Sequence, residues 1–348
     1  WWDLRAHRRM TWFYDEAPDG NVAMVGELDL TQGAETVVAL AFGRSAAEAA
    51  LQARAAMADA DPGTYVAAWT RWHERHASPD PGARLWESSA MVLKTHQDKT
   101  LDGATVASLS IPWGFARGDD DLGGYHLVWS RDMVEAAGGF LAIGADREVR
   151  EALTYLNVTQ EADGYWAQNM WIEGEAYWSG QQMDETALPI LLVDQAWRCG
   201  VIDDDGLRAH WPMVRRAASF IVRNGPVTQQ DRWEEDPGYT PFTLAAEITS
   251  LLAAAALAEH LGEPELAPYL RETADTWNGH IERWTHAHDT ELARRCGVEG
   301  YYVRIAPPDH GPVGSQAVVV DDPAPPRLVH EEDGQGRLVH LLSRPVGL

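Results

Sequence analysis

The sequence contains few cysteines and no long apolar run. Its 348 residues include two cysteines, Cys199 and Cys296, without the CxxC or Cys/His spacing that a zinc site needs. Because the two are isolated, we expect both to be small buried side chains. No run of about 18 apolar residues and no charged-then-apolar leader appears, so we expect no membrane span. The chain starts at Trp1 rather than Met, so a leader can be missing and the compartment stays unassigned.

Basic residues are also scarce. The chain has 28 Lys and Arg against 53 Asp and Glu, which gives a formal net charge of −25. Phosphate backbones and anionic membrane surfaces are repelled by such a chain. We therefore expect neither nucleic acid nor a membrane as a partner.

Tryptophan, by contrast, is abundant, with 16 residues. An indole offers a flat apolar face on which a sugar ring can stack, and one donor for the sugar hydroxyls. Carbohydrate is therefore the favoured ligand class. The alternative, that these side chains only fill a large helical core, stays open at the level of composition.

The first segment of the chain has the pattern of strands. Apolar and polar residues alternate around turn clusters over residues 9–30 and again over 35–43. Two or three strands are not stable alone, so this segment is interpreted as the end of a larger β region.

Two helices are predicted next. Ser45 and Glu48 form a capping pattern for a helix over residues 45–60, and a second helix is predicted over 65–76. The stretch 78–82, rich in Pro and Gly, is the best domain boundary in the chain.

From residue 85 onward, the apolar periodicity predicts one helix after another. The long connections 96–130 and 160–183 are rich in Gly, Asp, Trp and Tyr, which is typical of functional loops on a rigid scaffold. No repeat of fixed period is visible, so a closed helical barrel is favoured over a solenoid. After Ile305, Pro and Gly interrupt any helical period. The predicted helices span residues 85–95, 131–143, 146–158, 184–199, 206–223, 241–260 and 264–284.

The strongest candidate for catalysis is the acidic loop 231–235, which reads Asp-Arg-Trp-Glu-Glu. Glycosidic cleavage needs two carboxyl groups, one protonated and one ionised. An indole desolvates a neighbouring carboxyl, and a second negative charge disfavours another ionisation, so one of Glu234 and Glu235 can stay protonated near neutral pH. A solvated acidic turn is the alternative.

A second cluster, over residues 123–132, runs into a predicted helix. Arg131 and Asp132 offer donors and acceptors to sugar hydroxyls, while Tyr125 and Trp129 offer flat faces. The alternative is an ordinary helix start, with Asp132 near the positive end of the helix dipole.

A third cluster interleaves amides, carboxylates and indoles over residues 166–185. This density of functional groups is hard to explain by packing alone. Trp166, Trp171 and Trp178 are nevertheless all candidates for the core, and we expect at least one of them to lie there.

No cofactor is predicted. The glycines near residues 114–118 and 123–124 lack the context of a phosphate-binding loop, and no GxSxG elbow or HExxH helix occurs. The run Asp119 to Asp121 could bind calcium, but it lacks the ligand spacing of an EF-hand loop. A solvated loop is therefore favoured, and we assign no structural calcium ion. We expect no metal ligands in the site.

Four longer segments carry a family resemblance. They read IPWGFARGDDDLGGYHLVWSRDM, QNMWIEGEAYWSGQQMDETALPILL, DRWEEDPGYTPFTLAAEI and GYYVRIAPPD. In this order they resemble the bacterial branch of glycoside hydrolase family 15, the glucoamylase and glucodextranase family, over roughly residues 86–309.

The resemblance implies a mainly α fold with four parts. Residues 1–44 would be the end of an N-terminal β-sandwich domain, and residues 45–83 a helical linker. Residues 84–309 would form part of an (α/α)6 catalytic barrel. Residues 310–348 do not resemble the family, and we expect this tail to be truncated or out of frame.

The resemblance also implies roles for individual residues, with Glu234 as the general acid. The sugar-binding residues that it implies are Tyr125, Trp129, Arg131 and Asp132 around the non-reducing terminal glucose, Trp178, Gln182 and Asp184 in the third cluster, and Asp231, Trp233 and Glu235 around the acid.

The implied activity is exo-acting hydrolysis with inversion, which releases glucose from the non-reducing ends of α-glucans. The acid and base carboxyls would lie roughly 6.5–9.5 Å apart. The base belongs beyond residue 309, where Glu331 and Glu332 lack the family's aromatic surroundings, so we assign none. A trehalose hydrolase of the same family and an inactive carbohydrate-binding fragment are the alternatives, and a phosphorylase on a related barrel is less favoured.

Overall fold

The computed structural model describes residues 2–12, 26–31, 33–43, 45–58, 61–77, 80, 82, 85–109, 125–308, 329–332 and 338–341. The chain divides into two compact units, with the described residues up to 77 in the first and those from 80 onward in the second.

The first unit contains three helices, α1 (Trp2–His7), α2 (Ala46–Ala58) and α3 (Pro62–His73). The capping pattern predicted for α2 is present, since the Ser45 Oγ accepts a hydrogen bond from the Glu48 amide at 3.2 Å. The Asp61 side chain caps α3 by accepting from the amides of Gly63 and Thr64. Both predicted helices of this segment are therefore found.

The strands predicted over residues 9–30 and 35–43 are not formed where the structure describes these stretches. The short helix α1 was not predicted. An alternating pattern becomes a strand only when a neighbouring strand takes up its backbone hydrogen bonds. Within the described part of this segment, no such neighbour is paired with it.

The second unit is built from helices that follow one another along the chain. They agree with the predicted helices to within a few residues, except that the single helix predicted over residues 264–284 is divided. The bounds are α4 (Trp86–His96), α5 (Ser130–Ala142), α6 (Asp146–Thr159), α7 (Met183–Arg198), α8 (Asp204–Asn224), α9 (Pro241–Leu261), a 3-10 turn (Pro264–Leu266), α10 (Ala267–Asn278), α11 (Ile281–Thr285) and α12 (Glu291–Cys296).

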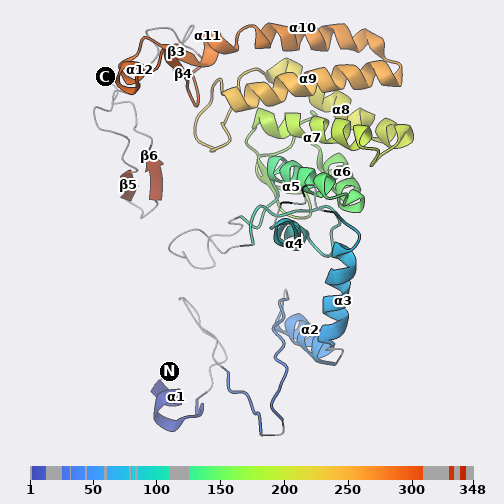
Figure 1. Cartoon of the computed structure of the whole chain (residues 1–348), viewed down its shortest axis with the longest axis vertical. Coiled ribbons are helices and arrows are strands. Elements are labelled where there is room, and N and C mark those ends of the chain that lie inside the picture. The colour runs from blue at the N-terminus through green and yellow to red at the C-terminus, as the bar shows by residue number, and fades with distance from the viewer. Residues whose placement is uncertain are drawn as a thin grey trace. The chain divides into compact units, whose positions relative to one another are not determined.

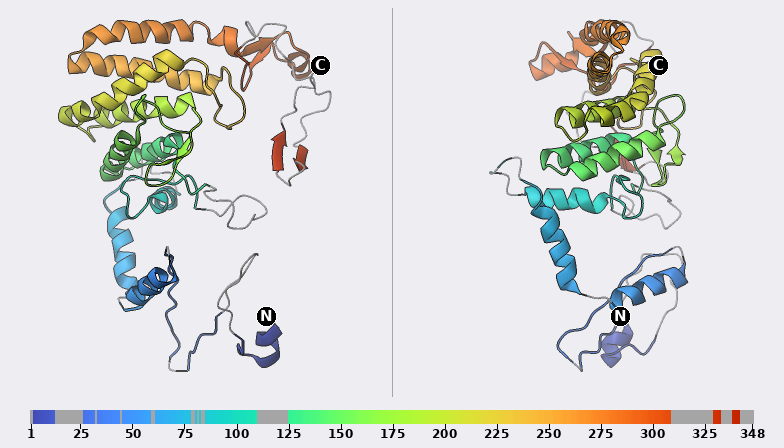
Figure 2. Two further views of the ribbon diagram at one scale, coloured as in Figure 1. Left: turned by 180° about the vertical axis from the view of Figure 1, so that it is seen from behind. Right: turned by 90° about the vertical axis from the view of Figure 1, so that its right-hand side faces the viewer.

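Alternate helices of this unit pack side by side. Helix α5 contacts α7, and α7 contacts α9, while α6 and α8 lie between them in sequence and pack against the same helices (Figure 1, Figure 2). Helices α7 and α9 carry ten or more buried residues each, because both have neighbours on several sides. The loops that enter α5, α7 and α9 are thereby held close together.

Helix α9 is unusually apolar. Among the described residues it is the one helix whose length and composition would suit a membrane span, and 67% of its apolar window is buried inside the protein. A buried core helix passes the same test, and the contacts of α9 with α7 and α10 are those of a core helix.

Three antiparallel hairpins accompany the helices. Strand β1 (Asn169–Met170) pairs with β2 (Ala176–Trp178), and β3 (His286–His288) pairs with β4 (Gly300–Tyr302). Strand β5 (Val329–Glu332) pairs with β6 (Leu338–Leu341) in the segment without a helical period.

The expectation that both cysteines are buried is wrong, because Cys199 and Cys296 are free and exposed. Each lies at the C-terminal end of a helix, Cys199 after α7 and Cys296 at the end of α12, where the chain turns outward. The expectation for the indoles holds: Trp166 is fully buried, and its Nε1–H donates to the Leu156 carbonyl at 3.1 Å.

Two glycines with a left-handed backbone provide a test of how tightly the second unit is packed. Gly164 has φ +105°, and a Cβ there would lie 2.4 Å from the Arg216 carbonyl oxygen, whereas Gly262, at φ +87° after α9, has no atom within 4 Å of that position. We expect Gly262→Ala to lower the free energy of unfolding by about 1 kcal/mol. Gly164→Ala should cost roughly 3 kcal/mol, because the backbone must also move. Urea unfolding of both variants measures the difference, and equal losses would contradict the packing at Gly164.

Candidate active site

Pairs of backbone hydrogen bonds tie the candidate loops together. Val128 exchanges two bonds with Met170, at 2.8 and 2.9 Å. Thr228 exchanges two with Gly238, at 3.1 and 3.0 Å, and thereby closes the loop that carries the acidic cluster. Tyr239 is bridged to Ala306 by two bonds of 2.8 Å. The Met183 amide in the third cluster donates to Thr228 Oγ1 at 3.2 Å, so these bonds connect all three clusters.

A buried arginine joins the start of α5 to the start of α7. Arg131 Nη1 donates to Gln182 Oε1 at 2.6 Å and to Asp184 Oδ2 at 2.9 Å. Glu185 Oε1 lies 3.2 Å from the same nitrogen. All four side chains are buried, and the Ser130 hydroxyl adds a bond of 2.9 Å to the Glu185 carbonyl. The sequence placed Arg131, Gln182 and Asp184 in one site, and the structure brings them into contact.

The guanidinium of Arg131 is anchored on one side only. Its Nη1 makes the contacts just described, and its Nε lies 3.7 Å from Asp132 Oδ2, whereas Nη2 has no partner among the described residues. Burial lowers the pKa of Arg131, but the surrounding carboxyls, together with the hydrogen bond to Asp184, outweigh this and raise it above its ordinary value. Arg131 thus stays charged and keeps free donors for a ligand.

The candidate acid, Glu234, lies in a strained turn. Its backbone has φ +64°, in the left-handed region that few residues other than glycine adopt, and its amide donates to the Asp231 carbonyl at 2.8 Å. The Trp129 Nε1–H donates to Glu234 Oε1 at 2.7 Å, across 105 positions of sequence. This bond holds the Glu234 carboxyl near the start of α5, where it interacts electrostatically with Asp132.

The indole that contacts the acid is not the one the sequence suggested. Sequence reasoning placed the ring of Trp233 against the acidic pair, but the Trp233 side chain is 59% exposed. The guanidiniums of Arg232 and Arg304 lie over its ring, 5.2 and 5.8 Å from the centroid. The indole that donates to Glu234 is therefore that of Trp129, while the Trp233 ring lies against two arginines and is largely exposed.

Arg304, which sequence reasoning did not single out, holds the acidic loop. It forms an ion pair with buried Asp231, a second with Glu235 at 2.9 Å and a longer one with Asp236 at 3.7 Å. The Asp231 carboxylate also accepts from the Glu235 amide at 3.1 Å. The segment GYYVRIAPPD carried the family resemblance, but its arginine faces carboxylates about 70 positions upstream, which no local pattern indicates.

The aromatic candidates differ in exposure, since Trp129 is buried while Tyr125 and Trp178 are exposed. Tyr125 stacks on Trp129 with ring centroids 5.7 Å apart. Tyr125 and Trp178 are 44% and 50% exposed, as expected for rings that await a ligand rather than fill a core. Burial, and then the charges of Glu234 and Asp132, raise the pKa of the Tyr125 phenol, so it remains a hydrogen-bond donor.

Asp132 completes the group around the acid. Burial raises its pKa, while the neighbouring Arg131 and Arg232 act in the opposite direction and Glu234 adds to the rise. Asp132 thus interacts electrostatically with Arg131, Glu234 and Tyr125. No contact joins the Trp178 indole to this group among the described residues, so its assignment to the site remains a prediction.

Metal-ligating clusters are not found in the described residues, where no group of three or more His, Cys, Asp or Glu side chains could hold an ion. The run Asp119 to Asp121, considered for calcium, lies outside the described residues.

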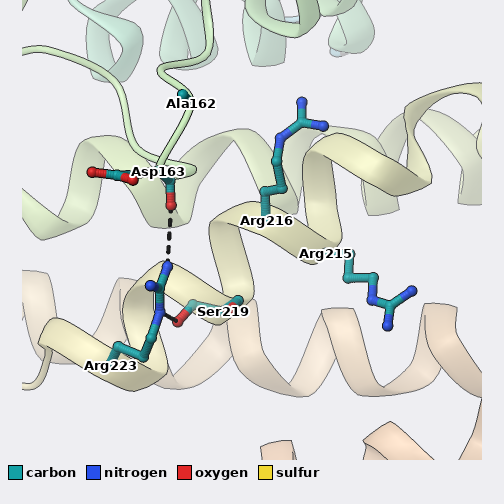
Figure 3. Close-up of a pocket in the computed structure, with 6 residues that line it drawn as sticks. All are labelled: Ala162, Asp163, Arg215, Arg216, Ser219 and Arg223. Atoms are coloured by element: carbon teal, nitrogen blue, oxygen red, sulfur yellow. Dashed lines mark hydrogen bonds between the residues drawn. The ribbon is translucent and has the colours of Figure 1, made fainter.

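A hollow of about 320 Å³ beside α8 lies apart from the candidate site. Figure 3 shows the side chains of Arg215 and Arg216 pointing to different sides, while Arg223 Nη2 donates to the Asp163 carbonyl at 3.2 Å. Since no candidate site residue lines this hollow, it takes no part in the chemistry. The lining residues are Ala162, Asp163, Arg215, Arg216, Ser219 and Arg223.

Comparison with known proteins agrees with this arrangement. Residues 159–309 match the model of Glycosyl hydrolases family 15, and residues 1–74 match that of Glucodextranase, domain N. A glucoamylase of Clostridium sp. (strain G0005) is 38% identical over 308 residues, which cover 87% of this chain and 42% of that protein. An uncharacterized glycosyl hydrolase of Methanocaldococcus jannaschii is 24% identical over 50% of this chain and 27% of its own length.

A solved structure agrees as well. The crystal structure of a bacterial glucoamylase complexed with acarbose superposes with a TM-score of 0.69 at 37% identity, covering 79% of this chain and 39% of that one. The chain thus spans about two fifths of the length of these two glucoamylases. Its serial helices form part of an (α/α)6 barrel, and the chain resembles glycosyl hydrolases family 15, whose model matches residues 159–309.

Proposed function

We propose that this protein is an exo-acting, inverting glycoside hydrolase that releases glucose from the non-reducing ends of α-glucans, with Glu234 as the general acid. The observation that carries the proposal is the 2.7 Å hydrogen bond from the Trp129 indole to the Glu234 carboxyl, because Trp129 lies two residues before the buried Arg131 at the start of α5. The 38% identity to a glucoamylase supports the class of substrate.

In this proposal the terminal glucose binds against the exposed ring of Tyr125, which stacks on the buried indole of Trp129. Arg131 Nη2 and the Asp132 carboxyl hydrogen-bond its hydroxyls, since the other side of the guanidinium is already engaged. Glu234 then donates a proton to the glycosidic oxygen, while a water activated by a second carboxylate attacks the anomeric carbon from the opposite face. We assign no base among the described residues.

The neighbours of Glu234 have supporting roles. Asp231 and Glu235 are clamped by Arg304, which holds the turn in its left-handed conformation. Trp178 and Trp233, both exposed, are proposed to stack against the leaving-group sugars. Parallel assays on maltotriose, isomaltotriose, dextran and trehalose would separate the α-glucan activity from trehalose hydrolysis.

Replacing the proposed acid tests the assignment directly. Glu234→Gln should lower kcat by about 10³-fold on maltotriose, because the amide cannot protonate the leaving oxygen, while acarbose binding measured by calorimetry should persist. Glu265→Gln, an exposed glutamate on the 3-10 turn, is the control and should leave kcat unchanged. Undiminished turnover in Glu234→Gln would refute the assignment.

The hydrogen bond from Trp129 can be tested on its own. Trp129→Phe keeps an aromatic face for Tyr125 but removes the N–H, so we expect kcat to fall roughly tenfold with a smaller change in KM. Trp197→Phe is a matched control, since its indole also donates to a carboxylate, Asp204 Oδ1 at 3.0 Å, far along α7 from the site. Equal kcat values in wild type and Trp129→Phe would show that this bond does not direct the acid.

A further inference from the structure

Two buried carboxyls near Arg131 have no role in the mechanism above. Glu185 on α7 and Glu247 on α9 are both 0% exposed. Neither carboxyl makes a hydrogen bond with a described residue, although Glu185 Oε1 lies 3.2 Å from Arg131 Nη1. Buried acids in this situation are rare, because a buried charge normally requires a partner and a full set of hydrogen bonds.

The charges around Arg131 are already balanced without them. Asp184 lies 2.9 Å from Arg131 Nη1 and also accepts from the Thr243 hydroxyl at 3.3 Å. One guanidinium and one carboxylate make a neutral pair. A second carboxylate on the same nitrogen would leave an uncompensated negative charge in the interior, which is strongly unfavourable.

The negative groups that face Glu185 and Glu247 favour the uncharged form of both acids. Glu185 faces Arg131 and Asp132 from α5, Asp184 from its own helix and Glu234 from the acidic loop, so three negative groups oppose one positive group. Glu247 faces only Asp184.

We propose that Glu185 is a positioning residue for Arg131, which it supports as an uncharged carboxylic acid. This inference rests on the proposed function of Arg131 in sugar binding. Packed behind Nη1, the side chain of Glu185 keeps this nitrogen on Gln182 and Asp184 and leaves Nη2 directed to the ligand. Asp184 acts as the buried counter-ion, and the Asp132 carboxyl lies farther away, 3.7 Å from Nε.

The titration behaviour is consistent with this role. Burial raises the pKa of the Glu185 carboxyl well above 4.5, and the attraction of Arg131 only partly opposes the rise. Burial likewise raises the pKa of Glu247 well above 4.5.

Glu247 supplies a matched control for the positioning role. It is buried to the same extent and also lacks hydrogen bonds, but it has no contact with Arg131 within ion-pair distance in the described structure. Its carboxyl instead lies against the backbone at Gly225, where an added Cβ would approach Glu247 Oε1 to 2.4 Å. Changes at Glu247 therefore perturb the core without touching the guanidinium.

The first measurement is the affinity for acarbose, by calorimetry near pH 6. Glu185→Ala should weaken binding about tenfold, because Arg131 loses its support, and Glu185→Gln should restore the affinity to within about threefold of wild type. Glu247→Ala should lower the melting temperature but leave the affinity unchanged. If Glu185→Gln binds as weakly as Glu185→Ala, an ionised carboxylate is required at this position and the proposal is wrong.

The second measurement is the melting temperature from pH 5 to pH 8. Since the folded-state pKa is raised above the unfolded value of 4.5, the stability that each neutral acid contributes is full below about pH 4.5 and is lost as pH rises through the folded pKa. The wild type should therefore lose stability as pH rises, and both Glu185→Gln and Glu247→Gln should show a shallower loss. A slope for Glu185→Gln that equals the wild-type slope overturns the proposal.

These two readouts separate the inference from the proposed function. A wild-type protein that binds no acarbose contradicts the sugar-binding role of Arg131, and the pH slopes then still decide whether Glu185 is uncharged. Normal acarbose binding together with an unchanged slope in Glu185→Gln contradicts only the inference about Glu185.

Discussion

The buried contact between Arg131 and Asp184 is the interaction on which the rest of the site depends. It joins the first turn of α5 to the first turn of α7 with both partners nearly inaccessible to solvent. A buried ion pair is not a large source of stability by itself, but removing one partner leaves a charge that costs about 3–5 kcal/mol. The ion pair matters for geometry, because it fixes Arg131 Nη1 and leaves Nη2 for a ligand.

A second set of charges lies in the loop of the candidate acid. Arg304 pairs with Asp231 and with Glu235, and between these two residues Glu234 has a left-handed backbone. The indole of Trp129 connects the two sets, since it precedes Arg131 in the chain and donates to Glu234. The strained turn at Glu234 and the buried ion pair of Arg131 are thus linked through Trp129.

Sequence reasoning predicted the features that are local and missed those that are not. Helices such as α6 and α8 follow from apolar periodicity, and α2 from its cap at Ser45, since both signals lie within a few turns of chain. The break after α10 and the exposure of Cys199 depend on packing between helices, and a local apolar pattern does not predict such packing. The roles of Trp129 and Arg304 involve partners 70 to 105 positions away. Family resemblance named most site residues, but only the fold could identify which of them touch.

The central claim is that the terminal sugar of an α-glucan is held between Arg131 and Glu234. The most direct test is a crystal structure of the protein with acarbose, the ligand in the bacterial glucoamylase structure that superposes on this chain. The account predicts that the terminal ring lies on Tyr125, within hydrogen-bonding distance of Arg131 Nη2 and of the Glu234 carboxyl. Acarbose bound elsewhere, with Arg131 Nη2 and Glu234 free of contact, would contradict it.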